Sequence, residues 1–201
     1  MTFNCMIAGV GGQGTVLASK LLAAAAMKQG YNVRTTETIG MSQRGGCVVS
    51  HVRIGGGQDS PYNIFSPLIP LGKADALIAF EPAEAVRQLS YLSEHGSLIL
   101  CDSAIKPIGG MQAGEYEASV MIDYLKATVQ KLTVIDGRRL MQHSAKTLNV
   151  ALLGAAAQSG IFPFNAEILK QVIPEMLPQR FWELNLASLE TGRSLYNETS
   201  E

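Results

Sequence analysis

The chain has 201 residues, of which 47% are hydrophobic and 16% are charged, so it can bury a substantial core, and we expect a single domain over residues 1–201. Its formal net charge of -1 gives no overall electrostatic reason to expect nucleic acid or an anionic membrane as a partner. The first residues lack the basic segment of a secretory signal, and the most apolar helical stretch, residues 17–27, is shorter than the roughly 20 residues that span a bilayer. We therefore expect a soluble, cytoplasmic protein that binds neither nucleic acid nor membrane.

Strand and helix signals alternate along the first half of the chain. An apolar run at residues 3–8 meets a glycine cluster, and a stretch rich in Ala and Leu follows at residues 15–29 and ends at Gly30. These features predict a strand, a tight turn and a helix. Residues 31–37 and 46–54 carry the β-branched and alternating patterns of two further strands.

The second half of the chain begins with a loop and ends in helices. Three glycines and three prolines between residues 55 and 70 favour a long loop. A strand, a helix, two further strands and three further helices are then predicted at residues 74–80, 82–93, 96–101, 132–135, 145–158, 165–176 and 179–197. This order predicts an α/β fold of Rossmann-like type, with a mostly parallel sheet flanked by helices, right-handed crossovers and a helical C-terminal third.

The three cysteines and three histidines are scattered. Cys5, Cys47 and Cys101 lie far apart, so the chain offers neither a disulfide framework nor a four-thiolate iron-sulfur site of its own. The histidines have no compact zinc-ligand spacing either. We expect reduced, packed cysteines and no metal ligands, so any redox centre must come from another chain.

Residues 9–14 (GVGGQG) have the spacing GxGxxG between a predicted strand and a predicted helix. Their backbone could approach a phosphate at the helix N-terminus, and Glu37 lies about where a ribose-binding carboxylate would. The same glycines also fit a purely structural tight turn, with Glu37 as an exposed carboxylate at a strand end. The motif supplies no catalytic group, so nucleotide binding and a structural turn both stay open.

Residues 41–46 (MSQRGG) follow the second predicted strand, at the edge where ligands bind in open α/β sheets. Arg44 could hold a carboxylate or phosphate through a bidentate pair, and the following glycines would allow close backbone approach. The alternative is a turn with a solvated arginine. We favour the anion site.

Taken together, residues 9–14, 41–46 and 48–53 (VVSHVR) resemble, in order and spacing, the gamma-type domain of 2-oxoacid:ferredoxin oxidoreductases. Residues 74–82 (ADALIAFEP) and 149–154 (NVALLG) are similar to later signatures of that family, so the resemblance covers most of the chain. Within the family, the chain looks most like the beta subunits of indolepyruvate:ferredoxin oxidoreductases.

The resemblance implies a reaction in which a 2-oxoacid, coenzyme A and oxidised ferredoxin give an acyl-CoA, carbon dioxide and reduced ferredoxin. It implies that thiamine diphosphate and iron-sulfur clusters reside on a large partner subunit, that coenzyme A is a cosubstrate, and that ferredoxin is reached through the complex. The small subunit would be inactive alone. A self-dimer through the partner-facing surface is a further expectation.

We expect the edge formed by the two loops to face the partner and to help enclose the substrate or coenzyme A. Arg44 is the expected main anion contact, Ser42 and Gln43 could equally cap the local turn, and Glu37 is a secondary candidate that could orient Arg44. No catalytic residue is assigned to this chain. The candidate contacts are Gly11, Gly12, Gln13, Gly14, Thr15, Ser42, Gln43, Arg44, Gly45 and Gly46.

Two rival interpretations remain at this point. A self-sufficient oxidoreductase binding NAD(P) or a flavin would need the glycine loop to hold a dinucleotide and a separate catalytic residue, and the sequence offers no convincing second part. A non-enzymatic assembly module would use the glycine loop only as a turn. It differs from the favoured interpretation only if the complete complex turns over without this chain.

Overall fold

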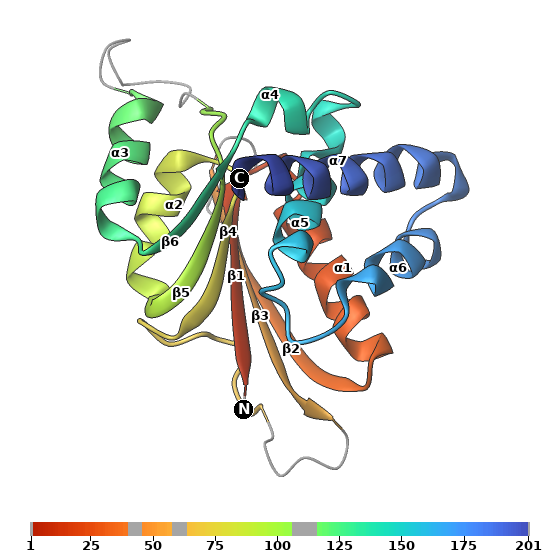
Figure 1. Ribbon diagram of the computed structural model, residues 1–201. Helices are drawn as coiled ribbons and strands as arrows, with labels where there is room; N and C mark the ends of the chain where they lie inside the picture. The colour runs from red at the N-terminus through yellow and green to blue at the C-terminus, as the bar shows by residue number, and fades with distance from the viewer. Residues whose placement is uncertain (1, 40–45, 58–63, 106–115, 201) are drawn as a thin grey trace.

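The computed structural model describes residues 2–39, 46–57, 64–105 and 116–200. Within these ranges one sheet runs through the middle of the molecule, and helices cover both of its faces (Figure 1). The six strands are β1 (Phe3–Val10), β2 (Tyr31–Ile39), β3 (Cys47–Gly57), β4 (Ala74–Ala79), β5 (Leu92–Cys101) and β6 (Lys131–Ile135). The predicted α/β architecture is therefore confirmed.

The strand order is β2-β3-β1-β4-β5-β6. The pairs β1/β4, β4/β5 and β5/β6 are parallel, whereas β3 is antiparallel to both β1 and β2. Only residues 40–46 separate β2 from β3, and a parallel crossover takes a dozen or more residues, so the short link forces the antiparallel pairing. The sheet is mostly parallel, as expected, but β3 lies between β1 and β2.

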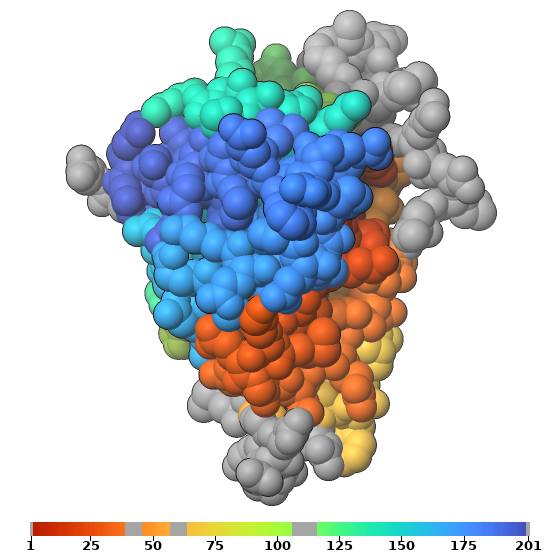
Figure 2. Space-filling view, turned by 90° about the vertical axis from the view of Figure 1, so that its right-hand side faces the viewer, coloured from red at the N-terminus to blue at the C-terminus, as the bar shows by residue number. Residues whose placement is uncertain are grey.

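One face of the sheet carries most of the helices. Figure 2 looks onto this face and shows α7 and α6 above α1. The opposite face carries α2 and α3, and α4 follows β6 (Figure 1). The helices are α1 (Thr15–Lys28), α2 (Pro82–Gln88), α3 (Ala118–Thr128), α4 (Gly137–Leu140), α5 (Leu148–Gln158), α6 (Leu169–Met176) and α7 (Trp182–Ser200). Among the described residues, no helix is both long enough and apolar enough to cross a bilayer.

The predicted helices all form, with shifted ends. The helix expected at residues 82–93 ends at Gln88 and continues as a 3-10 turn to Tyr91, and β5 then begins at Leu92 rather than at residue 96. Short 3-10 turns likewise precede α5, α6 and α7. The sequence interpretation missed α3 and α4. Leu125 is the only residue of α3 that is fully buried, so this helix contributes little to the core.

Strand β1 is buried on both faces and separates two hydrophobic cores. Cys5 and Ile7 point into the core beneath α1 and α5, and Met6 and Ala8 point into the core beneath α2 and α3. A strand covered on both faces has no polar side to alternate with, which explains the continuous apolar run in its sequence.

Helices α5 and α7 cross in very close contact at two glycines. A Cβ atom built on Gly192 would lie 1.7 Å from the carbonyl oxygen of Ala151, and one built on Gly154 would lie 2.1 Å from that of Leu189. Both obstacles are backbone atoms, so no rotamer change can relieve the clash. Gly154, which closes the NVALLG signature, is required by this crossing.

We expect Gly192→Ala to lower the free energy of unfolding by about 3 kcal/mol, because α7 must move away from α5 to admit a methyl group. Urea denaturation checks this. Ser194→Ala, at an exposed position on the same helix, is the matched control and should change stability little. Equal stability of Gly192→Ala and the control would contradict the close crossing.

Candidate functional site at the carboxyl edge of the sheet

The adjacent parallel strands β1 and β4 send their following helices to opposite faces of the sheet. Helix α1 packs in the core shared with α5, whereas Ala85 of α2 packs in the other core. The carboxyl ends of β1 and β4 therefore form a topological switch point, which is where open α/β sheets bind ligands. The glycine loop after β1 and the turn at Glu81 after β4 meet at this point.

The glycine loop is held by its own backbone. Gly12 and Gly14 have φ values of 104° and 82°, which favour glycine. The Gln13 amide donates to the carbonyl of Val10 over 3.0 Å, and the Gly11 amide donates to the carbonyl of Gly46 over 2.8 Å. The last bond brings together the two segments that the sequence analysis singled out.

The side chain of Gln13 links the ends of β1 and β4. Its Oε1 accepts a hydrogen bond from the Val10 amide over 2.7 Å, and its Nε2 donates to the carbonyl of Phe80 over 3.1 Å. A Cβ atom on Gly9 would lie 2.8 Å from Oε1, so the amide fills the space beneath the loop. Gln13 therefore has a structural role in this site, in addition to any contact with a ligand.

Asn149, at the start of α5, closes the loop from the other side. Its Nδ2 donates to the carbonyl of Gly14 over 3.2 Å, and a Cβ atom on Gly14 would lie 2.6 Å from that nitrogen. Asn149 is buried, and its Oδ1 has no hydrogen-bond partner. In the sequence, Asn149 stands out only as the first residue of the NVALLG signature. A buried polar residue opening an otherwise apolar helix was the available signal.

Thr15 is buried in the first turn of α1, and that turn has neither a side-chain cap nor an acidic residue. The backbone N–H groups of this first turn are therefore of the kind that can donate hydrogen bonds to an anion. Ser42, Gln43, Arg44 and Gly45 lie outside the described residues, so the anion contact expected of Arg44 stays a prediction.

Glu37 does not lie where a dinucleotide site would need it. In such a site the acidic residue ends the strand next to the glycine-loop strand, but here β3 lies between β1 and β2. Glu37 instead faces α1, where its Oε1 accepts from the Ser19 hydroxyl over 3.5 Å. This placement argues against the ribose-binding role.

Glu81 and Glu84 are buried at the same edge, which the sequence analysis did not anticipate. Glu81 caps α2 by accepting from the Glu84 amide over 3.0 Å, while its Oε1 has no hydrogen-bond partner. Burial raises the pKa of the Glu81 carboxyl, partly offset by the backbone amides of Glu84 and Ala83. The Glu84 carboxylate pairs with the Arg87 guanidinium three residues further along α2, but Glu84 is only 2% exposed, so this is not an ordinary surface pair. The available signal for this helix start in the sequence was the pair Glu81-Pro82 directly after an apolar run.

The cysteines are packed thiols. Burial raises the pKa of Cys101 to about 11. Burial and, to a smaller extent, the neighbouring Glu84 carboxylate raise the pKa of Cys47 to about 12. Cys5 is fully buried, and its pKa is also raised by burial. Among the described residues no three His, Cys, Asp or Glu side chains come together in a way that could hold a metal ion. The donor set described for this chain therefore does not fit an iron-sulfur cluster.

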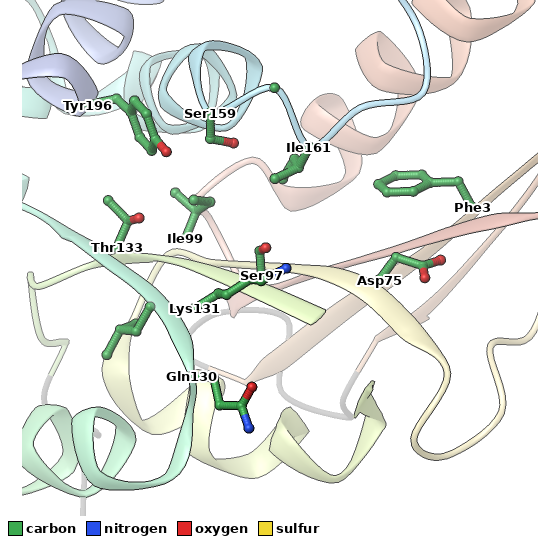
Figure 3. A pocket seen from close by; sticks show the side chains of 12 residues that line it. Phe3, Asp75, Ser97, Ile99, Gln130, Lys131, Thr133, Ser159, Ile161 and Tyr196 are labelled. Carbon is green, nitrogen blue, oxygen red and sulfur yellow. The ribbon is translucent and has the colours of Figure 1, made fainter. Parts of the chain in front are cut away.

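A separate pocket of about 530 Å³ opens at the amino ends of the strands, the end of the sheet opposite the glycine loop. Figure 3 shows Tyr196, Ser159 and Ile161 on one side of it and Ser97, Lys131 and Thr133 of the sheet on the other. Ligands of open α/β sheets bind at the carboxyl ends of strands. This pocket is thus not the candidate site.

These features define an open α/β domain whose two loops meet at the switch point without the strand arrangement of a dinucleotide site. The chain belongs to the Pyruvate ferredoxin/flavodoxin oxidoreductase family, which matches residues 4–195. The resemblance noted from the motifs is confirmed.

Relatives and a solved structure agree with this assignment. Indolepyruvate oxidoreductase subunit IorB of Thermococcus kodakarensis is 35% identical over 94% of this chain and 94% of its own length. The subunit of the same name from Archaeoglobus fulgidus is 35% identical over 98% and 96% of the two chains. The gamma subunit of keto/oxoacid ferredoxin oxidoreductase from Geobacter sulfurreducens has the same fold, with a TM-score of 0.69 at 22% identity, covering 98% of this chain and 99% of that chain.

Burial of Glu81 predicts a specific dependence of stability on pH. Its pKa is higher in the folded than in the unfolded chain, so folding binds a proton, and stability falls as the pH rises from the unfolded pKa to the folded one. In Glu81→Gln the side chain at position 81 is neutral at every pH. We expect the variant and the wild type to have similar unfolding free energies near pH 4, and the variant to be the more stable at pH 8.

Urea denaturation at a series of pH values measures this difference. Glu94→Gln, at an exposed position on β5, is the control and should follow the wild type at every pH. A difference between Glu81→Gln and the wild type that does not grow with pH would show that Glu81 is not held protonated by burial.

Proposed function

We propose that this chain, as a single domain over residues 1–201, is the small subunit of a 2-oxoacid:ferredoxin oxidoreductase that acts on indolepyruvate or another aryl pyruvate. The observation that carries the proposal is the 35% identity to indolepyruvate oxidoreductase subunits over almost the whole of both chains. The shared family supports the reaction class, and the shared fold supports the subunit type.

The proposed reaction converts a 2-oxoacid, coenzyme A and oxidised ferredoxin into an acyl-CoA, carbon dioxide and reduced ferredoxin. Thiamine diphosphate, held by the large subunit, supplies the carbanion chemistry, and iron-sulfur clusters outside this chain carry the electrons. The separate, packed Cys5 and Cys101 support this division, because neither thiol is available as a cluster ligand.

We propose that the edge formed by residues 11–15 and 42–46 faces the large subunit and helps to enclose the substrate or coenzyme A. The hydrogen bond between Gly11 and Gly46 supports a common surface, because it joins the two segments at the switch point. In this arrangement Arg44 is the main anion contact, and Ser42 and Gln43 add neutral hydrogen bonds. Glu37 is secondary, and its contact with Ser19 supports a role in holding β2 against α1.

The alternative, a self-sufficient oxidoreductase binding NAD(P) or a flavin, is not favoured. β3 separates Glu37 from the loop strand. This removes the acidic strand end next to the glycine loop that a dinucleotide site of this type uses.

We expect 2-oxoacid-dependent reduction of ferredoxin or a viologen only when this chain is co-purified with its large subunit. The isolated chain should neither turn over nor bind nicotinamide or flavin nucleotides in a titration. Tight dinucleotide binding with turnover by this chain alone would contradict the subunit assignment. Full activity of the large subunit without this chain would favour the assembly module.

Arg44→Ala should weaken binding of the anionic substrate or coenzyme A in the assembled enzyme by roughly 10- to 150-fold, as expected for the loss of one charge-assisted interaction. The effect should fall mainly on KM, which initial-rate kinetics measure for each substrate. Arg180→Ala, at an exposed position before α7, is the control. Unchanged KM values for every substrate in Arg44→Ala would remove the anion contact from this proposal.

A further inference from the structure

Residues 64–71, which lead into β4, present large apolar side chains to solvent. Phe65 is 92% exposed, Leu71 is 65% exposed and Leu68 is 54% exposed, all within seven consecutive residues. Scattered exposed apolar side chains are normal on a protein surface, but a concentration of this kind marks an interaction site. We refer to residues 64–71 as the apolar ridge. It lies at the amino ends of the strands, away from the glycine loop.

The apolar ridge is firmly attached to the sheet. The buried side chains of Ile64 and Ile69 anchor it on either side of Phe65 and Leu68. The Arg53 guanidinium donates to the carbonyls of Ser66 and Leu68 over 2.9 and 3.3 Å, and the Ile69 amide donates to Nδ1 of His51 over 3.3 Å.

Pro67 and Pro70 restrict the backbone of the ridge further. A segment fixed in this way cannot turn its apolar side chains inward when it is alone in water. Their exposure is therefore built into the fold, and a surface prepared in advance binds at a lower entropic cost than a loose one.

The surroundings of the ridge are basic and partly concave. A pocket of about 300 Å³ lies beside Phe65 and is lined by Ile64 and by residues 32–34 of the edge strand β2. Arg34 in this pocket is exposed, and it makes no ion pair among the residues that the structure describes. Lys73 is also exposed, and neither residues 31–36 nor residues 64–73 contain an acidic side chain. The carboxylate of Asp75, two residues further along, accepts a hydrogen bond from the Asn4 amide over 2.8 Å.

This charge pattern distinguishes between possible occupants. A two-fold contact between copies of the chain would place the same patch on both sides, so that Arg34 and Lys73 would meet a surface that carries the same basic residues. Like charges facing each other in an interface are unfavourable. The pattern fits a different protein surface, with an apolar side chain to meet Phe65 and carboxylates to meet Arg34 and Lys73.

We propose that the apolar ridge is a docking surface for an apolar, acidic patch on the large subunit. The inference rests on the proposed function, because that function supplies the large subunit. Permanent interfaces between subunits are the more hydrophobic kind, and Phe65 is the aromatic anchor of this one.

The test measures the affinity of the purified small subunit for the large subunit by biolayer interferometry, without any substrate. Phe65→Ser should weaken the affinity about tenfold or more, since a central aromatic anchor is lost. Arg34→Glu should weaken it as well, and more strongly at low salt than at high salt. Val120→Ser is the matched control, because Val120 on α3 is 63% exposed but lies outside the ridge. Urea denaturation should show the same stability for all three variants and the wild type.

Each other outcome has a defined meaning. Failure of the wild-type chain to bind the large subunit would contradict the proposed function itself. Wild-type affinity in Phe65→Ser would overturn the ridge as a docking surface while leaving the function in place. Two further results with Phe65→Ser would also overturn the proposal, provided that its affinity for the large subunit is unchanged. Loss of a self-dimer in ultracentrifugation would assign the ridge to a second copy of the chain. Loss of binding to vesicles containing one third phosphatidylglycerol would assign it to a membrane.

Discussion

The hydrogen bonds of the Gln13 side chain fix the geometry on which the candidate site depends. One amide group holds the end of β1 through the Val10 amide and the end of β4 through the Phe80 carbonyl. The two strands lead here to helices on opposite faces, and the Gln13 side chain adds a direct link to the backbone hydrogen bonds between their ends. The glycine loop is therefore a joint between two halves of the sheet, and GxGxxG spacing alone does not distinguish such a joint from a phosphate-binding loop.

The fold could be predicted from the sequence to the extent that its patterns are local. Alternating strands and helices gave the α/β class, and the apolar run at residues 3–8 gave the strand β1, which the structure shows to be buried on both faces. The position of β3 between β1 and β2 depends on which strands pair, a non-local property that periodicity does not contain. The shortness of residues 40–46 was the one usable indication that β3 is antiparallel. Helix α3, whose only fully buried residue is Leu125, was missed.

The site was less predictable, because the role of a residue there depends on its burial. Gly11 and Gly46 were expected at one edge, and a hydrogen bond joins them. Glu84 and Arg87 have the spacing of an ion pair on an exposed helix surface, yet Glu84 is buried. A three-residue spacing is the same for a buried and for an exposed pair, so the sequence does not distinguish them. Asn149 acts on the glycine loop from 135 residues away, a distance that only the packing of α5 against α1 bridges.

Two ends of this molecule carry features that a self-sufficient protein would avoid. At the carboxyl edge, Glu81 and Asn149 each keep a buried oxygen without a hydrogen-bond partner, which lowers the stability of the isolated chain. At the amino edge, the apolar ridge holds Phe65 in water on a segment that cannot rearrange to bury it. Selection for stability alone would remove both, because a glutamine at position 81 or a polar residue at position 65 is compatible with the fold. Their presence is accounted for if the chain works as one part of a larger assembly, in which contacts outside this chain offset the free energy that the fold gives up.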